Sequence, residues 1–331
     1  MHLGVPYSGD AMTQIRIGSR GSQLALWQAN HIAEQLRAHG HTVEIEIIRT
    51  TGDRMQQPGF VAPAIFDGKG IFIKEIEEAL AAGRIDLAVH SLKDLPTQLS
   101  PQFTLAAIPP RADPRDAFVC EPYWALHTLP HAGCIGTTSP RRRAQLLALR
   151  PDLQFVELRG NVDTRLRKLE EGACDALVLA CAGLDRLGRA ESVHQRFGLD
   201  ELTPAPGQGA LALETRSPEH ALDTDDATRD PEIYAAIRRL DHSPTRYATD
   251  AERAFLAAMG GGCELPLGAH CAPIEQDWLL HAQVLSPDGE QSVQLALPNQ
   301  VGEPPESLGR RAAEILIARG AMDLLNETAE A

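Results

Sequence analysis

The chain has 331 residues, of which 43% are hydrophobic and 23% charged, and its formal net charge at pH 7 is −14. This composition is typical of a soluble globular protein with two or three domains. The negative net charge argues against a nucleic-acid partner, which would need a basic excess. No segment approaches the ~20 consecutive apolar residues of a membrane span, so we expect no membrane partner either.

The amino terminus lacks the features of a secretory signal. The first fifteen residues contain no lysine or arginine, and Asp10 stands where a signal segment would be apolar. We therefore expect a cytoplasmic protein, in which residues 1–11 form a loose extension before Met12. We also expect a monomer.

Six cysteines are few for this length, and no two of them form a C-x-x-C pair. This argues against a disulfide framework or a zinc site, and we expect no metal. Most of the basic residues are arginines, since only four are lysine: Lys69, Lys74, Lys93 and Lys168. A GC-rich genome would produce this bias, and so would recognition of carboxylates, which the guanidinium group binds well.

The first half of the chain alternates strands and helices. Residues 15–17 begin a strand, a helix follows over 23–39, and residues 43–47 alternate as a second strand. Small and basic residues follow the strands, where an open parallel sheet binds its ligands. Arg20 and Ser22 are therefore candidate anion ligands. The alternative is a capping serine beside a solvated arginine.

Residues 55–70 show no periodicity and contain several glycines and prolines, which is typical of a flap, and this flap carries Lys69. A helix over 71–82 and a buried strand over 86–89 follow. Lys93 and Asp94 then lie at the carboxyl end of that strand. Among cationic groups Asp94 would stay ionised and could hold a proton or a cationic intermediate. The alternative is a capping aspartate before a proline.

The same pattern recurs between residues 110 and 209. Strand-like residues 132–139 lead into a helix that begins at Pro140, and the arginines at 141–143 oppose its dipole, which indicates an anion site. Next come a strand over 153–158, a helix over 163–170 and a strand over 175–180. Basic and polar candidates again follow the strands: Ser139, Arg141, Arg142, Arg159, Arg165 and Arg186.

The pattern predicts an α/β protein with two lobes around a central cleft, in the arrangement of periplasmic binding proteins, plus a small α+β domain at the carboxyl end. Residues 204–209, which include Gln208, form a hinge, and residues 210–214 return to the first lobe. We expect the first lobe to comprise residues 1–109 and 210–229, the second lobe residues 110–209, and the third domain residues 230–331. In the third domain we expect helices over 231–240, 245–259 and 306–319 and a hairpin of residues 278–284 and 291–297.

Three glycines at 260–262 end the helix over 245–259 and precede Cys263. Glycine permits positive φ and close approach by other groups, so this thiol can be presented on an open loop as a covalent attachment point. The alternative is a Schellman-type helix end followed by an ordinary buried thiol.

Several motifs together resemble the porphobilinogen deaminase family, also called hydroxymethylbilane synthases. They occur in the expected order over most of the chain: RIGSRGSQLALW (16–27), GKGIFIKE (68–75), AVHSLKDLP (88–96), DPRDAF (113–118), residues 136–142, LRGNVDTR (158–165), residues 206–209 and GGCELPLG (261–268). The flap departs mildly, since it has Asp67 before Gly68 where the family commonly has two glycines.

The resemblance implies a transferase of porphyrin and haem biosynthesis. Four porphobilinogen molecules would be condensed with loss of ammonia into the linear tetrapyrrole hydroxymethylbilane, on a dipyrromethane cofactor joined to Cys263 by a thioether. Asp94 would be the catalytic carboxylate. The resemblance implies that the cofactor is also held by Lys93, Ser139, Arg141, Arg142, Arg159, Arg165 and Gln208, and the substrate by Arg20, Ser22, Arg186 and Lys69.

A non-catalytic carboxylate receptor is the rival hypothesis, because the two-lobed fold is shared by such proteins and fold does not fix function. A receptor has no need of the glycine run before Cys263 or of a third domain.

Overall fold

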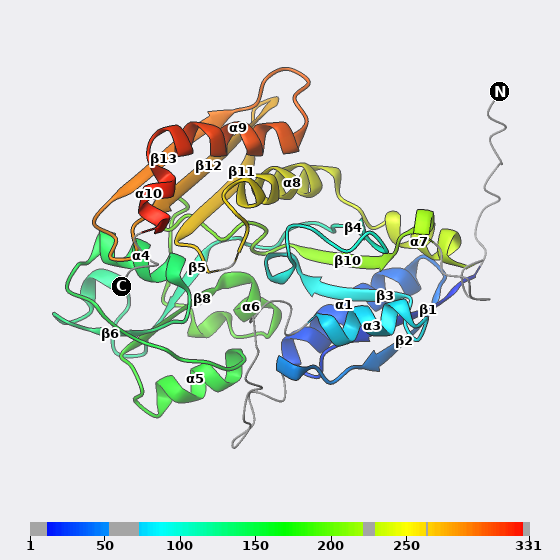
Figure 1. The fold of residues 1–331 in the computed structure, drawn as a ribbon. Helices are drawn as coiled ribbons and strands as arrows, with labels where there is room; N and C mark the ends of the chain where they lie inside the picture. Colours follow the sequence, from blue (N-terminus) through cyan, green and yellow to red (C-terminus); the bar gives the residue numbers. More distant parts are fainter. Residues whose placement is uncertain (1–11, 53–72, 221–228, 263, 327–331) are drawn as a thin grey trace.

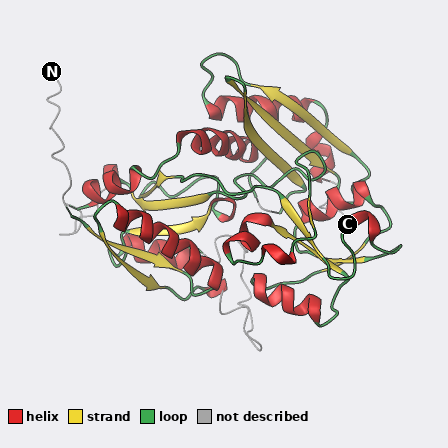
Figure 2. Ribbon diagram, turned by 180° about the vertical axis from the view of Figure 1, so that it is seen from behind, coloured by secondary structure: helices red, strands yellow, loops and turns green. Residues whose placement is uncertain are grey.

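The computed structural model describes residues 12–52, 73–220, 229–262 and 264–326 (Figure 1). Two lobes are each built on a five-stranded sheet, and a third domain is built on a three-stranded sheet. Figure 1 shows the third domain above the two lobes, and Figure 2 shows the same arrangement from behind. The predicted fold class is confirmed. Within the described ranges, no helix has both the length and the apolar character needed to cross a bilayer.

The first lobe has the strand order β2-β1-β3-β10-β4. Its strands are β1 (Gln14–Ser19), β2 (Thr42–Ile47), β3 (Leu87–Ser91), β4 (Phe103–Ala107) and β10 (Leu211–Arg216). Strands β1, β2 and β3 are parallel, and β10 is antiparallel to both of its neighbours. Ile15 and Ile17 of β1 pack with Ile32 and Leu36 of α1 (Gln23–Ala38) in the core. Helix α3 (Lys74–Ala81) packs on the same lobe.

The second lobe repeats this topology with the order β7-β6-β8-β5-β9. Its strands are β5 (Asp116–Val119), β6 (Cys134–Gly136), β7 (Gln154–Val156), β8 (Ala176–Ala180) and β9 (Gln195–Arg196). Its helices are α4 (Pro140–Leu149), α5 (Val162–Glu170) and α6 (Cys181–Arg186).

Short 3-10 turns occur in both lobes, at η1 (Leu92–Asp94), η2 (Leu126–Thr128), η3 (Ala190–Ser192) and η4 (Pro218–His220).

In each lobe, the strand that follows a crossover runs antiparallel to its neighbours in the sheet. The chain leaves the first lobe after β4 and enters the second as β5, and it returns as β10 between β3 and β4. Residues 211–216 therefore pair with strands of the first lobe. The last residues of β3 and β8, Ser91 and Ala180, line one small cavity between the lobes.

Helix α7 (Asp230–Arg238) packs against the first lobe. Its Ile233 and Ile237 belong to the core formed by β1 and α1. Asp230, at its first turn, accepts a hydrogen bond from Arg216 Nη2 at 2.7 Å, and that guanidinium also reaches Asp86 at 3.2 Å. Helix α7, which lies in the range expected for the third domain, thus contributes to the core of the first lobe.

The third domain comprises α8 (Ser243–Ala258), β11 (Leu267–Ile274), β12 (Asp277–Leu285), β13 (Ser292–Pro298), α9 (Pro305–Ala318) and α10 (Ala321–Asn326). The predicted hairpin is confirmed as β12 and β13. Strand β11 begins inside the motif GGCELPLG (261–268), where we expected a loop and no strand. Helices α8 and α9 pack together and supply Phe255 and Leu316 to the buried core of this domain.

Glu252 of α8 joins the three parts of the molecule. Its side chain is fully buried and accepts two hydrogen bonds from Arg111 in the first crossover, at 2.7 and 3.0 Å. It also accepts from the backbone N–H groups of Gly207 in the second crossover, at 2.7 Å, and Cys271 in β11, at 2.8 Å. A buried carboxylate is stable only when it is paired in this way. Glu252 therefore fixes the third domain to both crossovers.

Candidate active site

Lys93 and Asp94 lie in η1, directly after β3. Leu92 anchors this turn, since its side chain is fully buried and its N–H donates to Ala210 O at 3.0 Å. Asp94 is exposed, whereas Lys93 is partly buried. The structure therefore places the predicted catalytic carboxylate at the open end of β3, where solutes can reach it.

A buried carboxylate, Asp116 of β5, holds the base of the cleft together. It accepts from Arg142 Nε and Nη2 at 3.0 and 2.7 Å, and Arg141 Nη1 lies 2.8 Å from its other oxygen. Gln208 Nε2 donates to it at 3.0 Å. Burial raises the pKa of Asp116, but Arg141 and Arg142 outweigh this effect and hold the pKa below its usual value. Asp116 thus stays ionised and fixes both arginines at the start of α4.

Lys93 is connected to the same cluster through Gln208. Its Nζ donates to Gln208 Oε1 at 3.1 Å. Burial, together with the positive charge of Arg142, lowers the pKa of Lys93 to about 8, although Asp94 and Asp116 act in the opposite direction. Burial is the main cause of this shift, and the two carboxylates do not offset burial and the neighbouring arginines together.

Arg165 of α5 approaches this cluster from the second lobe. Burial and the charge of Arg142 lower the pKa of Arg165 to about 10, and Asp94 opposes that shift. Its Nε atom is buried and has no hydrogen-bond partner among the residues that the structure describes. A half-buried guanidinium with an unused, buried Nε donor fits a carboxylate ligand.

These groups form what we call the cleft cluster: Lys93, Asp94, Asp116, Arg141, Arg142, Arg165 and Gln208. Its residues come from both lobes and from the second crossover. In the described part of the chain, four of its side chains are cations and two are carboxylates. Asp116 is occupied by Arg141 and Arg142, so the cluster has an excess of positive charge beside Asp94. It can bind a molecule with more than one carboxylate.

Arg186 lies at the end of α6, and not on the polar stretch after a strand that we expected. Its Nη2 donates to Gly209 O at 2.7 Å, and burial lowers its pKa to about 10. Ser22 and Ser139 both act as helix N-caps, accepting from Ala25 N at 3.3 Å and Arg142 N at 3.4 Å. Arg20 is partly buried in the turn before α1.

Arg159 and Arg141 lie at opposite extremes of exposure. Arg159 is 78% exposed and pairs with Glu157 at 3.3 Å, so this ion pair lies at the surface. Arg141 is buried, and besides Asp116 it donates to Thr203 O at 2.8 Å. Lys69 and Cys263 lie outside the described residues.

The chain just before Cys263 has a defined path. Gly260 N donates to Ala257 O at 3.2 Å and Gly261 N to Leu256 O at 2.9 Å, which is the Schellman pattern. Both glycines have positive φ, +97° and +57°. A Cβ on Gly261 would lie 3.1 Å from Thr97 Oγ1, so this loop passes beside the segment that follows Asp94.

Sequence reasoning missed Asp116, Glu252 and Trp27 as residues that organise the site. Asp116 was inside the DPRDAF motif, but a single acid in a short apolar run gives no sign of the two arginines that it binds. Trp27 ends the motif RIGSRGSQLALW, but the motif gives no sign that the ring is 37% exposed and lies under the guanidinium of Arg186.

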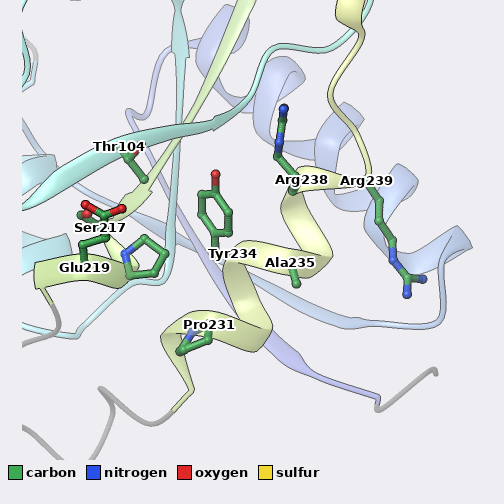
Figure 3. Close-up of a pocket in the computed structure, with 9 residues that line it drawn as sticks. Thr104, Ser217, Glu219, Pro231, Tyr234, Ala235, Arg238 and Arg239 are labelled. Carbon is green, nitrogen blue, oxygen red and sulfur yellow. The ribbon is translucent and has the colours of Figure 1, made fainter. Parts of the chain in front are cut away.

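A groove of about 680 Å³ lies elsewhere, on the first lobe beside α7 (Figure 3). None of its lining residues belongs to the cleft cluster. Figure 3 shows the guanidinium groups of Arg238 and Arg239 directed away from each other and from the ring of Tyr234. Arg238 pairs with Asp241. The groove therefore does not gather charge in the way that the cleft does.

Comparison with known proteins identifies the family. Residues 15–224 match the family model "Porphobilinogen deaminase, dipyromethane cofactor binding domain", and residues 247–318 match that of the porphobilinogen deaminase C-terminal domain. Porphobilinogen deaminase of Roseiflexus castenholzii is 46% identical over 314 residues, which are 94% of this chain and 98% of that protein. The enzyme of Rubrobacter xylanophilus is 45% identical over 309 residues, covering 93% and 95%.

Among solved structures, a putative methionine-binding lipoprotein of Bacillus subtilis is similar, with 12% identity and a TM-score of 0.39 over 67% of this chain and 90% of that one. A likeness at this level carries no argument about function. The two family models and the nearly full-length relatives show that the chain belongs to the porphobilinogen deaminase family.

Proposed function

We propose that this protein condenses four porphobilinogen molecules with release of four molecules of ammonia, and that hydrolysis by one water molecule then releases the product hydroxymethylbilane. The observation that carries the proposal is the excess of positive charge around Asp94, because porphobilinogen and the oligopyrroles built from it carry acetate and propionate carboxylates. Lys93, Arg142 and Arg165 supply that charge from both sides of one cleft.

The cleft cluster fits a dipyrromethane cofactor. The unused buried donor of Arg165 and the lowered pKa of Lys93 both indicate a site that favours carboxylates. We propose that Lys93, Ser139, Arg142, Arg165 and Gln208 hold the cofactor, and that Cys263 is its point of attachment. When bound, the cofactor supplies the pyrrole carbon to which the first incoming unit is joined. The path of Gly261 beside Thr97 supports an attachment loop close to Asp94.

We propose that Asp94 acts on the incoming porphobilinogen. As the carbon–nitrogen bond to the leaving ammonia breaks, positive charge develops on the pyrrole that remains. A carboxylate aimed at that charge stabilises the transition state. Asp94 can also accept a hydrogen bond from pyrrole N–H groups. Its position directly after β3 fixes its backbone, while its exposure leaves the side chain free to meet successive rings.

Arg20, Ser22, Lys69 and Arg186 are proposed to bind the substrate's carboxylates. The capping bonds of Ser22 and Ser139 do not oppose this role, because a hydroxyl that accepts one bond can still donate its own proton. Arg141 is proposed to act through Asp116, by holding Arg142 in place, since its guanidinium contacts Asp116 and the carbonyl of Thr203. Arg159 remains a proposed cofactor contact, which its surface pairing does not favour.

The intact mass of the purified protein tests the function. We expect an adduct of two linked pyrrole units, and we expect Cys263→Ser to abolish it. Cys271→Ser is the matched control, because Cys271 is buried in β11 and burial raises the pKa of its thiol to about 12. An active protein of unmodified mass would contradict the proposal, and a carboxylate receptor would show neither adduct nor turnover.

We also propose that the protein is a monomer of the cytoplasm and that it binds no nucleic acid. Light scattering after size-exclusion chromatography measures the mass of the particle in solution. A mass of about 36 kDa agrees with the calculated 35.9 kDa of one chain, and twice that mass would contradict the proposal.

A further inference from the structure

Trp27, on α1 of the first lobe, contacts a cation of the second lobe. The Cζ atom of Arg186 lies over the indole ring at 5.8 Å from its centroid. His31, one turn further along α1, stacks on the same indole with ring centroids 4.9 Å apart. Since Trp27 is 37% exposed, burial in the core does not account for its position. The ring forms part of the boundary between the lobes.

Arg186 makes a second contact, with the hinge. Its Nη2 donates to Gly209 O at 2.7 Å, and the same carbonyl accepts from Ala112 N at 3.2 Å. Ala112 lies in the first crossover and Gly209 in the second, so one carbonyl joins Arg186 to both. Gly209 has a φ of +87°, and a Cβ there would lie 2.7 Å from Ala112 O. Only glycine permits this approach.

Arg186 also borders a small cavity of about 50 Å³ that it shares with Lys93. Leu24 and Ser91 of the first lobe and Gly183 of the second line the same cavity. Two cations at one cavity between the lobes suit an incoming carboxylate. Arg186 therefore lies where substrate binding and the contact between the lobes meet.

We propose that Trp27 is a positioning residue for Arg186 in substrate binding. The ring and the Gly209 carbonyl together hold the guanidinium at the edge of the cleft, and a carboxylate of porphobilinogen replaces the contact with Gly209 when it binds. Arrival of the substrate thereby releases Arg186 from the carbonyl of Gly209, and so from its contact with the crossovers. The proposal rests on the proposed function, in particular on the role of Arg186 toward the substrate.

Kinetics of the cofactor-bearing enzyme test this role. Trp27→Leu removes the π face while keeping an apolar side chain, and we expect KM for porphobilinogen to rise on the order of three- to thirty-fold, as loss of a cation–π contact predicts. We expect kcat to change by less than about twofold. Trp27→Phe keeps a π face and should recover most of the loss. Equal losses in the two variants would overturn the proposal.

Fluorescence gives a readout that a purely structural role would not change. In a Trp124→Phe, Trp278→Phe background, Trp27 is the one remaining tryptophan. We expect its emission to change when porphobilinogen is added, and we expect Arg186→Gln to abolish that change. An emission change that persists in Arg186→Gln, or no change in the parent protein, would overturn the proposal.

The two proposals fail in different ways. If the parent enzyme shows no turnover of porphobilinogen, the proposed function is wrong. If it turns over and Trp27→Leu leaves KM unchanged, the inference about Trp27 is wrong and the function stands.

Discussion

Two groups of charged residues in this molecule both combine arginine with aspartate, but they differ in the ratio of cations to carboxylates. In the first lobe, Arg16 and Arg216 meet Asp86 and Asp230, so two cations are matched by two carboxylates. In the cleft cluster, four cations meet two carboxylates within the described residues. The first group holds β1, β3, β10 and α7 together. The second has charge left over, and that excess marks the binding site better than the presence of arginine does.

Removing one carboxylate from each group is expected to have the largest effect. Asp116→Ala removes the carboxylate that pairs with buried Arg141 and Arg142, and Asp230→Ala removes one of the two carboxylates that pair with buried Arg216. Each substitution should lower the free energy of unfolding by about 3–5 kcal/mol. Urea denaturation measures this loss. Only Asp116→Ala should also impair turnover under conditions where both variants are folded.

Asp277→Ala is the control, because Asp277 is exposed at the start of β12 and its loss should change stability by less than about 0.5 kcal/mol. If Asp230→Ala impaired turnover as strongly as Asp116→Ala, the distinction between the two groups would fail.

Asp94 differs from both buried carboxylates, since it is exposed. We expect Asp94→Asn to reduce kcat by about 10²–10³-fold, the loss expected when one group that stabilises developing charge is removed. The melting temperature should stay within about 2 °C of the parent. Steady-state turnover and calorimetry check the two expectations. Near-normal turnover would return Asp94 to the alternative role of a cap before Pro96.

The excess of cations also predicts a dependence on pH. Burial and Arg142 lower the pKa of Lys93 from 10.5 to about 8, so between these values the unfolded chain binds more protons than the folded one. In cofactor-free protein, stability should therefore rise with pH through this window. Because Lys93 is only partly buried, we expect a gain of about 1–2 kcal/mol.

Urea unfolding of Cys263→Ser at pH 7.5 and 9.5, with and without Lys93→Gln, isolates this gain from the titration of other groups. Lys93→Gln should remove it. A gain of equal size in both proteins would show that Lys93 is not its source.

Arg159 should show the smallest effect. Its side chain is 78% exposed and paired with Glu157, and surface pairs contribute about 0–1 kcal/mol. We expect Arg159→Gln to change KM by less than about twofold, whereas Arg165→Gln should change it by more than tenfold. A larger effect at Arg159 would mean that it turns into the cleft when substrate is bound.

Much of the fold followed from periodicity and from glycine and proline positions. The strands at 43–47 and 176–180, the start of α4 at Pro140 and the hairpin of β12 and β13 all agree with the pattern. Strand β11 was not predicted because it begins at Leu267, inside the motif GGCELPLG, where the glycine run and Cys263 indicate a loop. Helix α7 has the pattern of any amphipathic helix, which does not specify which core it covers.

The candidate site was predictable where position along a strand determines it. Lys93 and Asp94 follow a buried strand, so their place at the cleft could be inferred. Arg159 and Arg165 were not distinguishable, because the direction in which each side chain points depends on packing between helix and sheet. The balance of charge around Asp116 depends on residues far apart in sequence, such as Arg142 and Gln208, so it emerges only in the folded chain.

The most direct test of the account is a double-mutant cycle between Arg165 and the cofactor, measured as the free energy of unfolding. We predict that Arg165→Gln is neutral or stabilising in cofactor-free Cys263→Ser protein, because it removes an unmatched buried charge. In protein that carries the dipyrromethane cofactor, the same substitution should cost about 1–3 kcal/mol, because a charge-assisted hydrogen bond is lost. An equal cost in both proteins would contradict the claim that the cleft's excess charge serves its carboxylate ligands.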